Sequence, residues 1–365
     1  MSKYMELVKW IKEQIFLENL LFGQKVYSEN ELKDMFGVSR QTVRHAIGIL
    51  EKEGVVRRIK GSGTYVNDTR YLNQEKRSKV IVVTNYVDTY IFSRTIQGME
   101  YVLSQQGYSV QIVFTNNQNK KEKVVLEDII NRNEVAGVII ETTKSGIPNP
   151  NLDLYKELQR RKVPVLFING FYPALTIPHV SINDRMAGKK ATQYLISMGH
   201  RRIGGIFKLD DVQGHQRYAG YVEAMNEAGL EVDDLKVLWV DTEDVKNLAK
   251  CTERILERIE DCTGLFCYND YVAVALMEIL KEQGMFVSDE LSLVSVDNSD
   301  LAVRGDVKLS TVPHPMERLG EKAAENLIKM MQDTSFDGTY EFDEDMIERD
   351  SVKKIIELDT ASQGF

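Results

Sequence analysis

From residue 80 onward, short apolar runs rich in β-branched residues alternate with amphipathic helical stretches. Strands are predicted at residues 80–84, 110–114, 135–140, 163–168, 203–207, 237–240, 265–268 and 291–296. Helices are predicted at residues 93–106, 122–131, 187–198, 217–228, 272–283 and 316–331. Continuous apolar strands that alternate with helices predict parallel sheets covered on both faces. Eight such strands are compatible with one barrel or with two doubly wound halves.

The stretch from residue 36 to residue 50 predicts the turn and second helix of a helix-turn-helix. Gly37 supplies a permissive backbone at the turn, and Ser39 can cap the helix that follows. Polar and basic side chains occupy the start of this helix, and Ala46, Ile47 and Leu50 recur on its opposite face. Such a helix can enter a DNA major groove while its back packs on a core.

The flanking sequence completes a small domain around this motif. Apolar residues recur at helical spacing from Tyr4 to Ile15, and Ser28-Glu29-Asn30-Glu31 is a capping box that opens another helix. The β-rich runs 55–59 and 64–66 bracket a glycine-containing tip, which predicts a hairpin wing. We therefore expect a winged helix-turn-helix domain at residues 1–68, a polar linker at 69–79, and a second domain at 80–358.

Charge and cysteine content constrain the setting of the protein. The first 70 residues carry 12 Lys and Arg against 9 Asp and Glu, whereas the rest of the chain carries 34 against 46. This imbalance confines attraction for phosphate to the amino-terminal head. Three clustered cysteines without a CxxC pair indicate reduced thiols, and no apolar run approaches the roughly 18 residues of a membrane span. We expect a cytoplasmic protein without membrane association.

The candidate DNA contacts lie on the recognition helix and the wing. Arg40 and Arg44 suit bidentate bonds to guanine, and Gln41 suits adenine. Ser39 and Thr42 suit phosphate contacts or helix caps. The wing contributes candidate contacts to the DNA backbone or minor groove at Arg57, Arg58 and Lys60.

The head resembles the GntR family of bacterial regulators. The resemblance rests on Ser28-Glu29-Asn30-Glu31-Leu32, on residues 36–44 and on Gly61-Ser62-Gly63-Thr64-Tyr65-Val66. It implies that Glu29 and Gly61 also approach DNA, although a carboxylate beside phosphate is repelled unless it accepts from a cytosine amino group. Tyr27 departs from the family pattern, which usually has Pro before the Ser-Glu pair.

The second domain resembles the LacI/GalR sensor, a periplasmic-binding-protein-like domain of type I. The matching segments are residues 96–100, 197–204, 217–221, 267–270, 293–298 and 309–315. The resemblance implies two Rossmann-like lobes joined by three crossings, a ligand in the cleft between them, and a homodimer formed through this domain.

Candidate effector contacts follow the predicted strands, because ligands of open α/β sheets bind beyond the carboxyl ends of strands. A sugar requires planar bidentate groups and aromatic surfaces, and both occur at these positions. The candidates from strand ends are Tyr86, Tyr90, Phe92, Glu141, Lys144, Asn169, Asp184, Lys208, Arg217, Asn269 and Asp297. The resemblance singles out Asn169, Arg217, Asn269 and Asp297 and adds His314.

A GntR-type head on a LacI-type body is similar to bacterial repressors of L-arabinose utilisation, and residues 141–145 and 205–214 carry this resemblance. It implies a double-stranded operator, L-arabinose as effector, no cofactor, and release from DNA when the sugar binds. The mixture of acids, amides and aromatics also leaves another pentose, a hexose or a purine open. The sequence has no HExxH, GxSxG, GxxxxGK[ST] or GxGxxG motif, which disfavours the alternative of a sugar-converting enzyme with a DNA-binding head.

Overall fold

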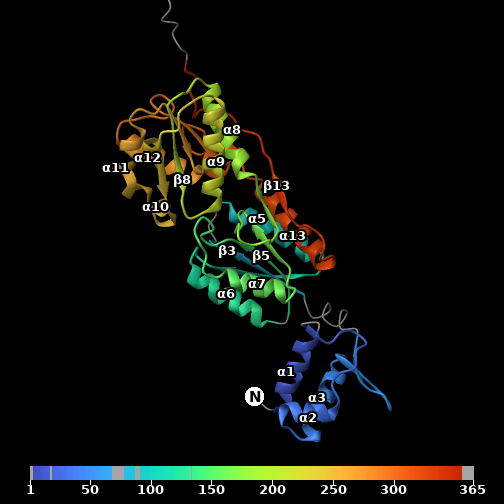
Figure 1. Ribbon diagram of the computed structural model, residues 1–365. Coiled ribbons are helices and arrows are strands. Elements are labelled where there is room, and N and C mark those ends of the chain that lie inside the picture. Colours follow the sequence, from blue (N-terminus) through green and yellow to red (C-terminus); the bar gives the residue numbers. More distant parts are fainter. Residues whose placement is uncertain (1–2, 17–18, 68–77, 87–90, 133, 356–365) are drawn as a thin grey trace, which may run out of the picture.

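The computed structural model describes residues 3–16, 19–67, 78–86, 91–132 and 134–355. These residues form a small amino-terminal head and two larger lobes (Figure 1). Among the described residues, no helix combines the length and apolar character that crossing a membrane requires.

The head contains three helices and a two-stranded wing. The helices are α1 (Lys3–Phe16), α2 (Glu29–Phe36) and α3 (Arg40–Lys52), and the wing pairs β1 (Val56–Ile59) with β2 (Gly63–Val66) in antiparallel register. Leu7, Leu32, Val43 and Leu50 are buried together in its core. The winged helix-turn-helix prediction is confirmed in its element order.

Local caps set the angles between the helices of the head. The Ser28 hydroxyl accepts from the Glu31 amide, and the Glu31 carboxylate accepts from the Ser28 amide, which completes the expected capping box. Gly37 has a φ of 58°, in the left-handed region that glycine tolerates at a tight turn. The Ser39 hydroxyl accepts from the Thr42 amide and begins the recognition helix α3.

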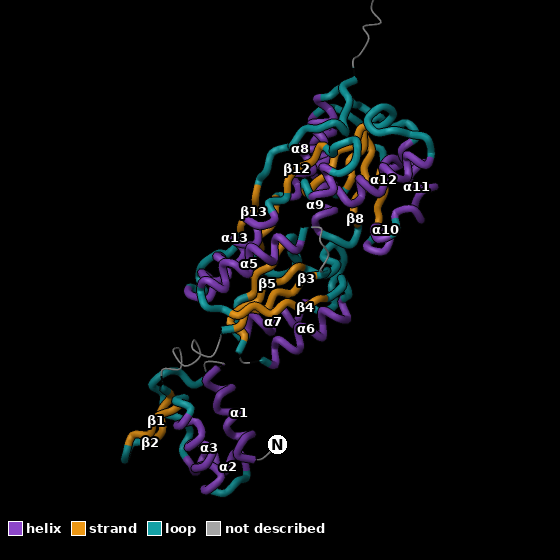
Figure 2. Tube along the Cα trace, turned by 180° about the vertical axis from the view of Figure 1, so that it is seen from behind, coloured by secondary structure: helices purple, strands orange, loops and turns teal. Residues whose placement is uncertain are grey.

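The first lobe is built on a six-stranded parallel sheet with strand order β13-β7-β6-β5-β3-β4. Helices α5 (Phe92–Gln105) and α13 (Met316–Gln332) cover one face, and α6 (Asn119–Asn131) and α7 (Leu152–Arg160) cover the other (Figure 2). The strands are β3 (Lys79–Thr84), β4 (Ser109–Phe114), β5 (Val135–Glu141), β6 (Val165–Ile168), β7 (His179–Ile182) and β13 (Tyr340–Phe342).

The second lobe is built on a five-stranded parallel sheet with strand order β12-β11-β10-β8-β9. One face carries α8 (Asp184–Ser197) and α9 (Val212–Glu227), and the other carries α10 (Thr242–Lys246), α11 (Thr252–Ile259) and α12 (Asp270–Glu282). The strands are β8 (Ile203–Lys208), β9 (Val237–Val240), β10 (Gly264–Cys267), β11 (Ser292–Asp297) and β12 (Ser310–Pro313). Short 3-10 turns η1 (Asp234–Lys236), η2 (Leu248–Cys251) and η3 (Asp300–Val303) connect some of these elements.

Three crossings join the lobes. The chain passes to the second lobe after β7 at Asn183, returns after β12 at His314, and passes over again after β13, so that Ile347 pairs with Thr311. Two separate sheets exclude the single barrel, and the expected pair of Rossmann-like lobes is confirmed. Three strands, β7, β12 and β13, were not predicted, and neither were helices α7, α10 and α11.

Candidate functional site

The recognition helix presents its predicted DNA-facing residues to solvent. Arg40, Gln41 and Arg44 are exposed on α3, opposite the buried face that holds the helix on the core. The wing likewise exposes Arg57 and Lys60. The residues are thus free to approach a duplex, which is the arrangement that groove entry requires.

Two pairs of predicted contacts bond to each other within the head. Both carboxylate oxygens of Glu29 accept from Nε of Arg44, at 3.1 and 2.9 Å, so Glu29 neutralises and orients the arginine. This pairing provides the carboxylate with a cationic partner inside the head. Ser39 and Thr42 bond to each other through their hydroxyls at 2.9 Å, and Ser39 caps α3 by accepting from the Thr42 amide. Gly61 lies at the exposed wing tip with a φ of 78°.

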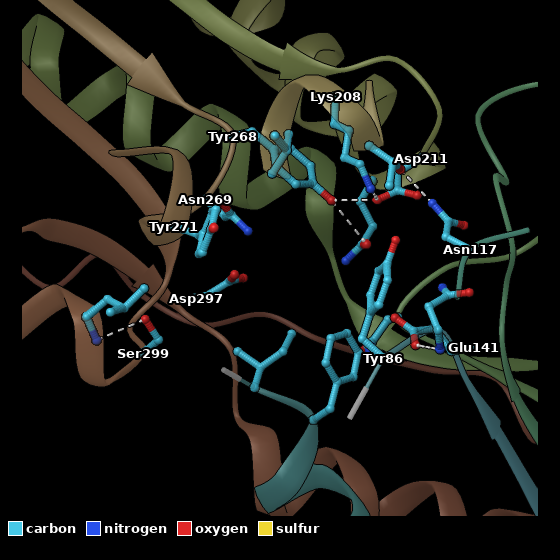
Figure 3. A pocket seen from close by; sticks show the side chains of 18 of the residues that line it. Tyr86, Asn117, Glu141, Lys208, Asp211, Tyr268, Asn269, Tyr271, Asp297 and Ser299 are labelled. Carbon is cyan, nitrogen blue, oxygen red and sulfur yellow. Dashed lines mark hydrogen bonds and ion pairs between the residues drawn. The ribbon is translucent and has the colours of Figure 1, made fainter. Parts of the chain in front are cut away.

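A cleft of about 430 Å³ lies between the lobes, at the carboxyl ends of strands from both sheets (Figure 3). This volume falls within the range of small-molecule sites. The first lobe contributes residues that follow β3, β4, β5 and β6, and the second lobe contributes residues that follow β8, β9, β10 and β11. The strand-end rule therefore located the cleft correctly.

Arg217, near the start of α9, is the charged centre of the cleft and is only 1% exposed. Its Nε donates to Asp184 Oδ1 at 2.8 Å, its Nη1 donates to the Tyr268 carbonyl, and its Nη2 lies 3.7 Å from Asp297 Oδ1. Burial lowers the pKa of Arg217, but the two carboxylates outweigh this and raise it. Burial also raises the pKa of Asp184 to about 6, against the pull of Arg217. The guanidinium therefore stays charged and fixed in orientation.

A second charged group lies at the carboxyl end of β8. Lys208 Nζ donates to Asp211 Oδ2 at 2.7 Å, and the Tyr268 hydroxyl donates to the same oxygen at 2.9 Å (Figure 3). Burial lowers the pKa of Lys208, while Asp211 and Asp210 raise it by more, so the net shift is upward. These groups offer a cation and a carboxylate on one wall of the cleft.

The facing wall carries Glu141 and Tyr86. Glu141 Oε2 accepts from the Thr84 hydroxyl and the Asn85 amide, each at 2.7 Å, and burial raises the pKa of Glu141 to about 7. The Tyr86 hydroxyl is buried and has no hydrogen-bond partner among the described residues. A buried polar atom without a partner is costly, so this hydroxyl is suited to bond a ligand.

The Asn169 amide, after β6, is oriented by His314. Nε2 of His314 lies 3.0 Å from Asn169 Oδ1. Burial, and to a lesser extent the positive charge of Arg217, lowers the pKa of His314 to about 3. The neutral ring can therefore donate to Oδ1, which leaves Asn169 Nδ2 as a donor without a partner among the described residues. This donor belongs to a side chain that lines the cleft.

The structure brings most of the predicted effector contacts together. Those that line the cleft are Tyr86, Phe92, Glu141, Asn169, Lys208, Arg217, Asn269 and Asp297. Tyr90 lies outside the described residues. Three further predicted contacts are not among the residues that line the cleft: Asp184 pairs with Arg217, His314 contacts Asn169, and Lys144 lies 3.6 Å from Asp210. Their direct contact with an effector stays a prediction.

Other residues of the cleft lining were not predicted from the sequence. Asn117 follows β4 and Asp211 follows β8, so the strand-end rule could have found both. Tyr268 is the last residue of the strand predicted at residues 265–268, and its place in that strand gives no local sign of a cleft contact. Lys246 lies on α10, a helix that was not predicted. Further lining residues are Asn85, Ile91, Gln213, Thr242, Val245, Tyr271, Ser299, Asp300, Leu301 and Arg304.

The cleft can bind a small polar molecule with a ring. Fixed cations, carboxylates and amide groups converge from both lobes, and the rings of Tyr86 and Phe92 lie among them. Such a mixture suits the hydroxyls and the apolar faces of a sugar.

Comparisons with known proteins identify both parts of the chain. Residues 3–66 match the bacterial regulatory proteins of the gntR family, and residues 192–352 match a periplasmic binding protein-like domain. The solved transcription regulator CcpA of Lactococcus lactis is 26% identical, with a TM-score of 0.67, over 76% of this chain and 99% of that chain.

Two relatives match along almost the whole chain, and both are described as arabinose metabolism transcriptional repressors. The protein of Geobacillus stearothermophilus is 36% identical over 97% of this chain and 99% of its own length. The protein of Halalkalibacterium halodurans is 36% identical over 92% of each. With a winged head, a two-lobed body and this similarity along both, the chain belongs to the family of arabinose metabolism transcriptional repressors.

Proposed function

We propose that the protein represses genes of L-arabinose utilisation and leaves its operator when L-arabinose binds between the lobes. It acts in the cytoplasm as a homodimer whose two heads bind the half-sites of a pseudo-palindromic operator. The observation that carries this proposal is the joining, in one chain, of a DNA-reading helix to a cleft lined by fixed polar groups. The similarity to arabinose repressors along 97% of the chain supports the choice of sugar.

The DNA-binding side of the proposal rests on α3. The helix exposes Arg40, Gln41 and Arg44, whose side chains match the hydrogen-bonding edges of guanine and adenine. Glu29 holds the Arg44 guanidinium through its Nε, so the other guanidinium nitrogens can face a base.

The sugar-binding side rests on Arg217, Glu141 and Asn169. Arg217 and Asn169 supply donors to ring hydroxyls, and Glu141 can accept from them. Tyr86 and Phe92 contribute aromatic surface to the same cleft. Because residues of both lobes contact one ligand, binding stabilises a closed arrangement and moves the lobes about their three crossings.

The test begins with operator selection from a random duplex library at low salt, followed by fluorescence anisotropy with and without L-arabinose. Thermal unfolding is then measured with pentoses, hexoses and purines. A ligand at 100 times its Kd adds about 2.7 kcal/mol of stability, so the effector will be evident. L-Arabinose is expected to weaken operator binding by about 5- to 150-fold, and operator to weaken sugar binding equally. Operator binding that no sugar changes would contradict the proposal.

Arg44→Ala separates the two activities. The variant loses a base contact and is expected to weaken operator binding by about 1–3 kcal/mol. Stabilisation by L-arabinose stays at the wild-type level, because Arg44 is in the head and the cleft is in the lobes. Anisotropy measures the first quantity and thermal unfolding the second. A variant that binds operator as tightly as the wild type would remove Arg44 from the interface.

A further inference from the structure

The two lobes contact each other directly at one rim of the cleft. The backbone N–H of Gly146, after β5, donates to the Asp210 carbonyl at 3.2 Å. The backbone N–H of Val212 donates to Ser145 Oγ at 3.1 Å. These two bonds join a loop of the first lobe directly to a loop of the second lobe, through protein atoms alone.

A set of side chains reinforces this contact. Asn117 Nδ2, from the first lobe, donates to Thr242 Oγ1 at 2.7 Å, and Thr242 Oγ1 donates to Asp210 Oδ2 at 2.7 Å. Lys144 completes the set, because its backbone N–H donates to Asn117 Oδ1 at 2.8 Å and its Nζ lies 3.6 Å from Asp210 Oδ2. Figure 3 shows the Asn117 side chain extended toward Asp211 on the opposite wall.

These contacts and the crossings lie toward opposite edges of the two sheets. The crossings leave from β13 and β7 at one edge of the first sheet and from β12 at one edge of the second. The rim contacts come from loops after β4 and β5 and after β8 and β9, toward the other edge of each sheet. Contacts at this place break when the lobes rotate apart about the crossings.

Gly146 allows the lobes to approach this closely. An added Cβ would lie 2.4 Å from the Leu209 carbonyl oxygen, 2.7 Å from the Asp211 nitrogen and 2.8 Å from His215 Nε2. All three atoms belong to the second lobe, so opening of the lobes relieves the overlap without disturbing the first lobe.

The loop that carries these contacts is anchored in the first lobe by Glu122. This buried carboxylate accepts from Asn149 Nδ2 and Asn151 Nδ2 at 2.8 and 2.7 Å, and from the Tyr172 hydroxyl at 2.7 Å. The Tyr172 hydroxyl also accepts from the Thr143 amide at 2.8 Å. Because these bonds fix the loop to the first lobe, the contacts at the rim hold the two lobes together and not the loop alone.

We propose that Asn117 and residues 144–146 of the first lobe, with residues 209–212 and Thr242 of the second, form a latch that stabilises the closed sensor before sugar arrives. The latch sets the fraction of molecules whose sensor is closed. If the proposed function holds, this fraction in turn sets the affinity for sugar and the strength of repression. Apparent affinity scales with the fraction of molecules in the binding-competent state.

The principal test is Gly146→Ala in the full-length protein. The added methyl group prevents closure, so L-arabinose affinity measured by calorimetry is expected to fall at least tenfold. Operator affinity without sugar is expected to equal or exceed that of the wild type, since the open state is the one that binds DNA. With sugar present, small-angle scattering is expected to show a larger radius of gyration for the variant than for the wild type. A variant that closes on sugar and binds it as the wild type does overturns the latch.

Ser145→Ala removes the acceptor of the Val212 amide and adds no bulk. A single neutral hydrogen bond gives an expected loss of L-arabinose affinity of about 2- to 10-fold. The control is Ile147→Ala on the same loop, where the wild-type side chain is 37% exposed and the affinity is expected to stay unchanged.

Hydrogen exchange of the Val212 amide tests the latch without any sugar. Exchange is expected to be slow in the wild type and faster in Ser145→Ala and Gly146→Ala. Equally rapid exchange in all three proteins overturns the latch. If wild-type protein ignores L-arabinose, the proposed effector is wrong, and the exchange rates at Val212 still decide whether the latch forms.

Discussion

At the residue scale, Arg217 links the cleft to the stability of the second lobe. It bonds Asp184 on α8 and faces Asp297 at the end of β11, and all three side chains are buried. A buried carboxylate that loses its cation is costly because neither water nor another charge replaces it. One residue therefore serves both the site and the packing around it.

Arg217→Ala is expected to lower the free energy of unfolding by about 3–5 kcal/mol and to abolish the response to sugar. Urea denaturation measures the first effect, and anisotropy with L-arabinose measures the second. Arg217→Lys keeps the charge but loses the planar fork, so it is the control that separates charge from geometry. Unchanged urea midpoints in both variants would show that the ion pairs contribute nothing to the fold.

Glu141 makes the stability of the protein depend on pH. The folded-state pKa is raised from 4.5 to about 7 by burial, so the folded protein holds this proton more tightly than the unfolded chain does. The contribution of Glu141 to stability therefore falls as the pH rises from about 4.5 to 7 and changes little above that. Asp184, whose pKa is raised to about 6, adds a similar slope, so a variant of Glu141 must be compared with the wild type.

Glu141→Gln is expected to remove this contribution. From pH 5 to pH 8, the free energy of unfolding of the variant is expected to rise relative to that of the wild type. Chemical denaturation at both pH values measures the difference. A difference that stays constant with pH would mean that Glu141 titrates near its ordinary pKa.

At the element scale, the close approach of α8 and α9 positions Arg217 beside Asp184. An added Cβ at Gly188 would lie 2.2 Å from the Arg217 carbonyl oxygen, and one at Gly220 would lie 2.0 Å from the Arg185 carbonyl oxygen. These helices can therefore pack backbone to backbone only with glycine at the contact.

Gly220→Ala is expected to cost about 1–3 kcal/mol of stability through overpacking. The matched control is Gly48→Ala within α3, where an added Cβ meets nothing within 4 Å. The control is expected to gain about 0.5–1 kcal/mol, because alanine favours a helix interior over glycine. Thermal unfolding of both variants gives the comparison, and equal effects would refute the packing argument.

The strands that the sequence analysis missed share a physical cause. β13 contains three residues, and β7 (His179–Ile182) and β12 (Ser310–Pro313) contain four each, with polar residues among them. Their pairing partners lie far away in the sequence, as when Tyr340 pairs with Val180. Local pattern predicts a strand when the run is long and apolar, and these runs are neither.

At the scale of the whole molecule, the proposed two-headed dimer predicts strong dependence of operator binding on salt. If each head neutralises about five phosphates, the slope of log affinity against log salt is about −9 for the dimer. Anisotropy titrations over a range of salt concentrations measure the slope, and Arg57→Ala is expected to reduce its magnitude. A slope near −2 would contradict two heads on one operator.

The sequence by itself determined the winged head, the alternation of strands and helices that makes parallel sheets, and the strand ends at which Glu141, Asn169 and Asn269 line the cleft. Periodicity, caps and strand ends are local, so a single stretch of chain records them. The tertiary structure decided that Asp184 and His314 serve as partners of cleft residues, that Lys144 faces Asp210, and that Gly146 brings the lobes together. These roles depend on atoms from distant segments that meet only after the chain has crossed between the lobes.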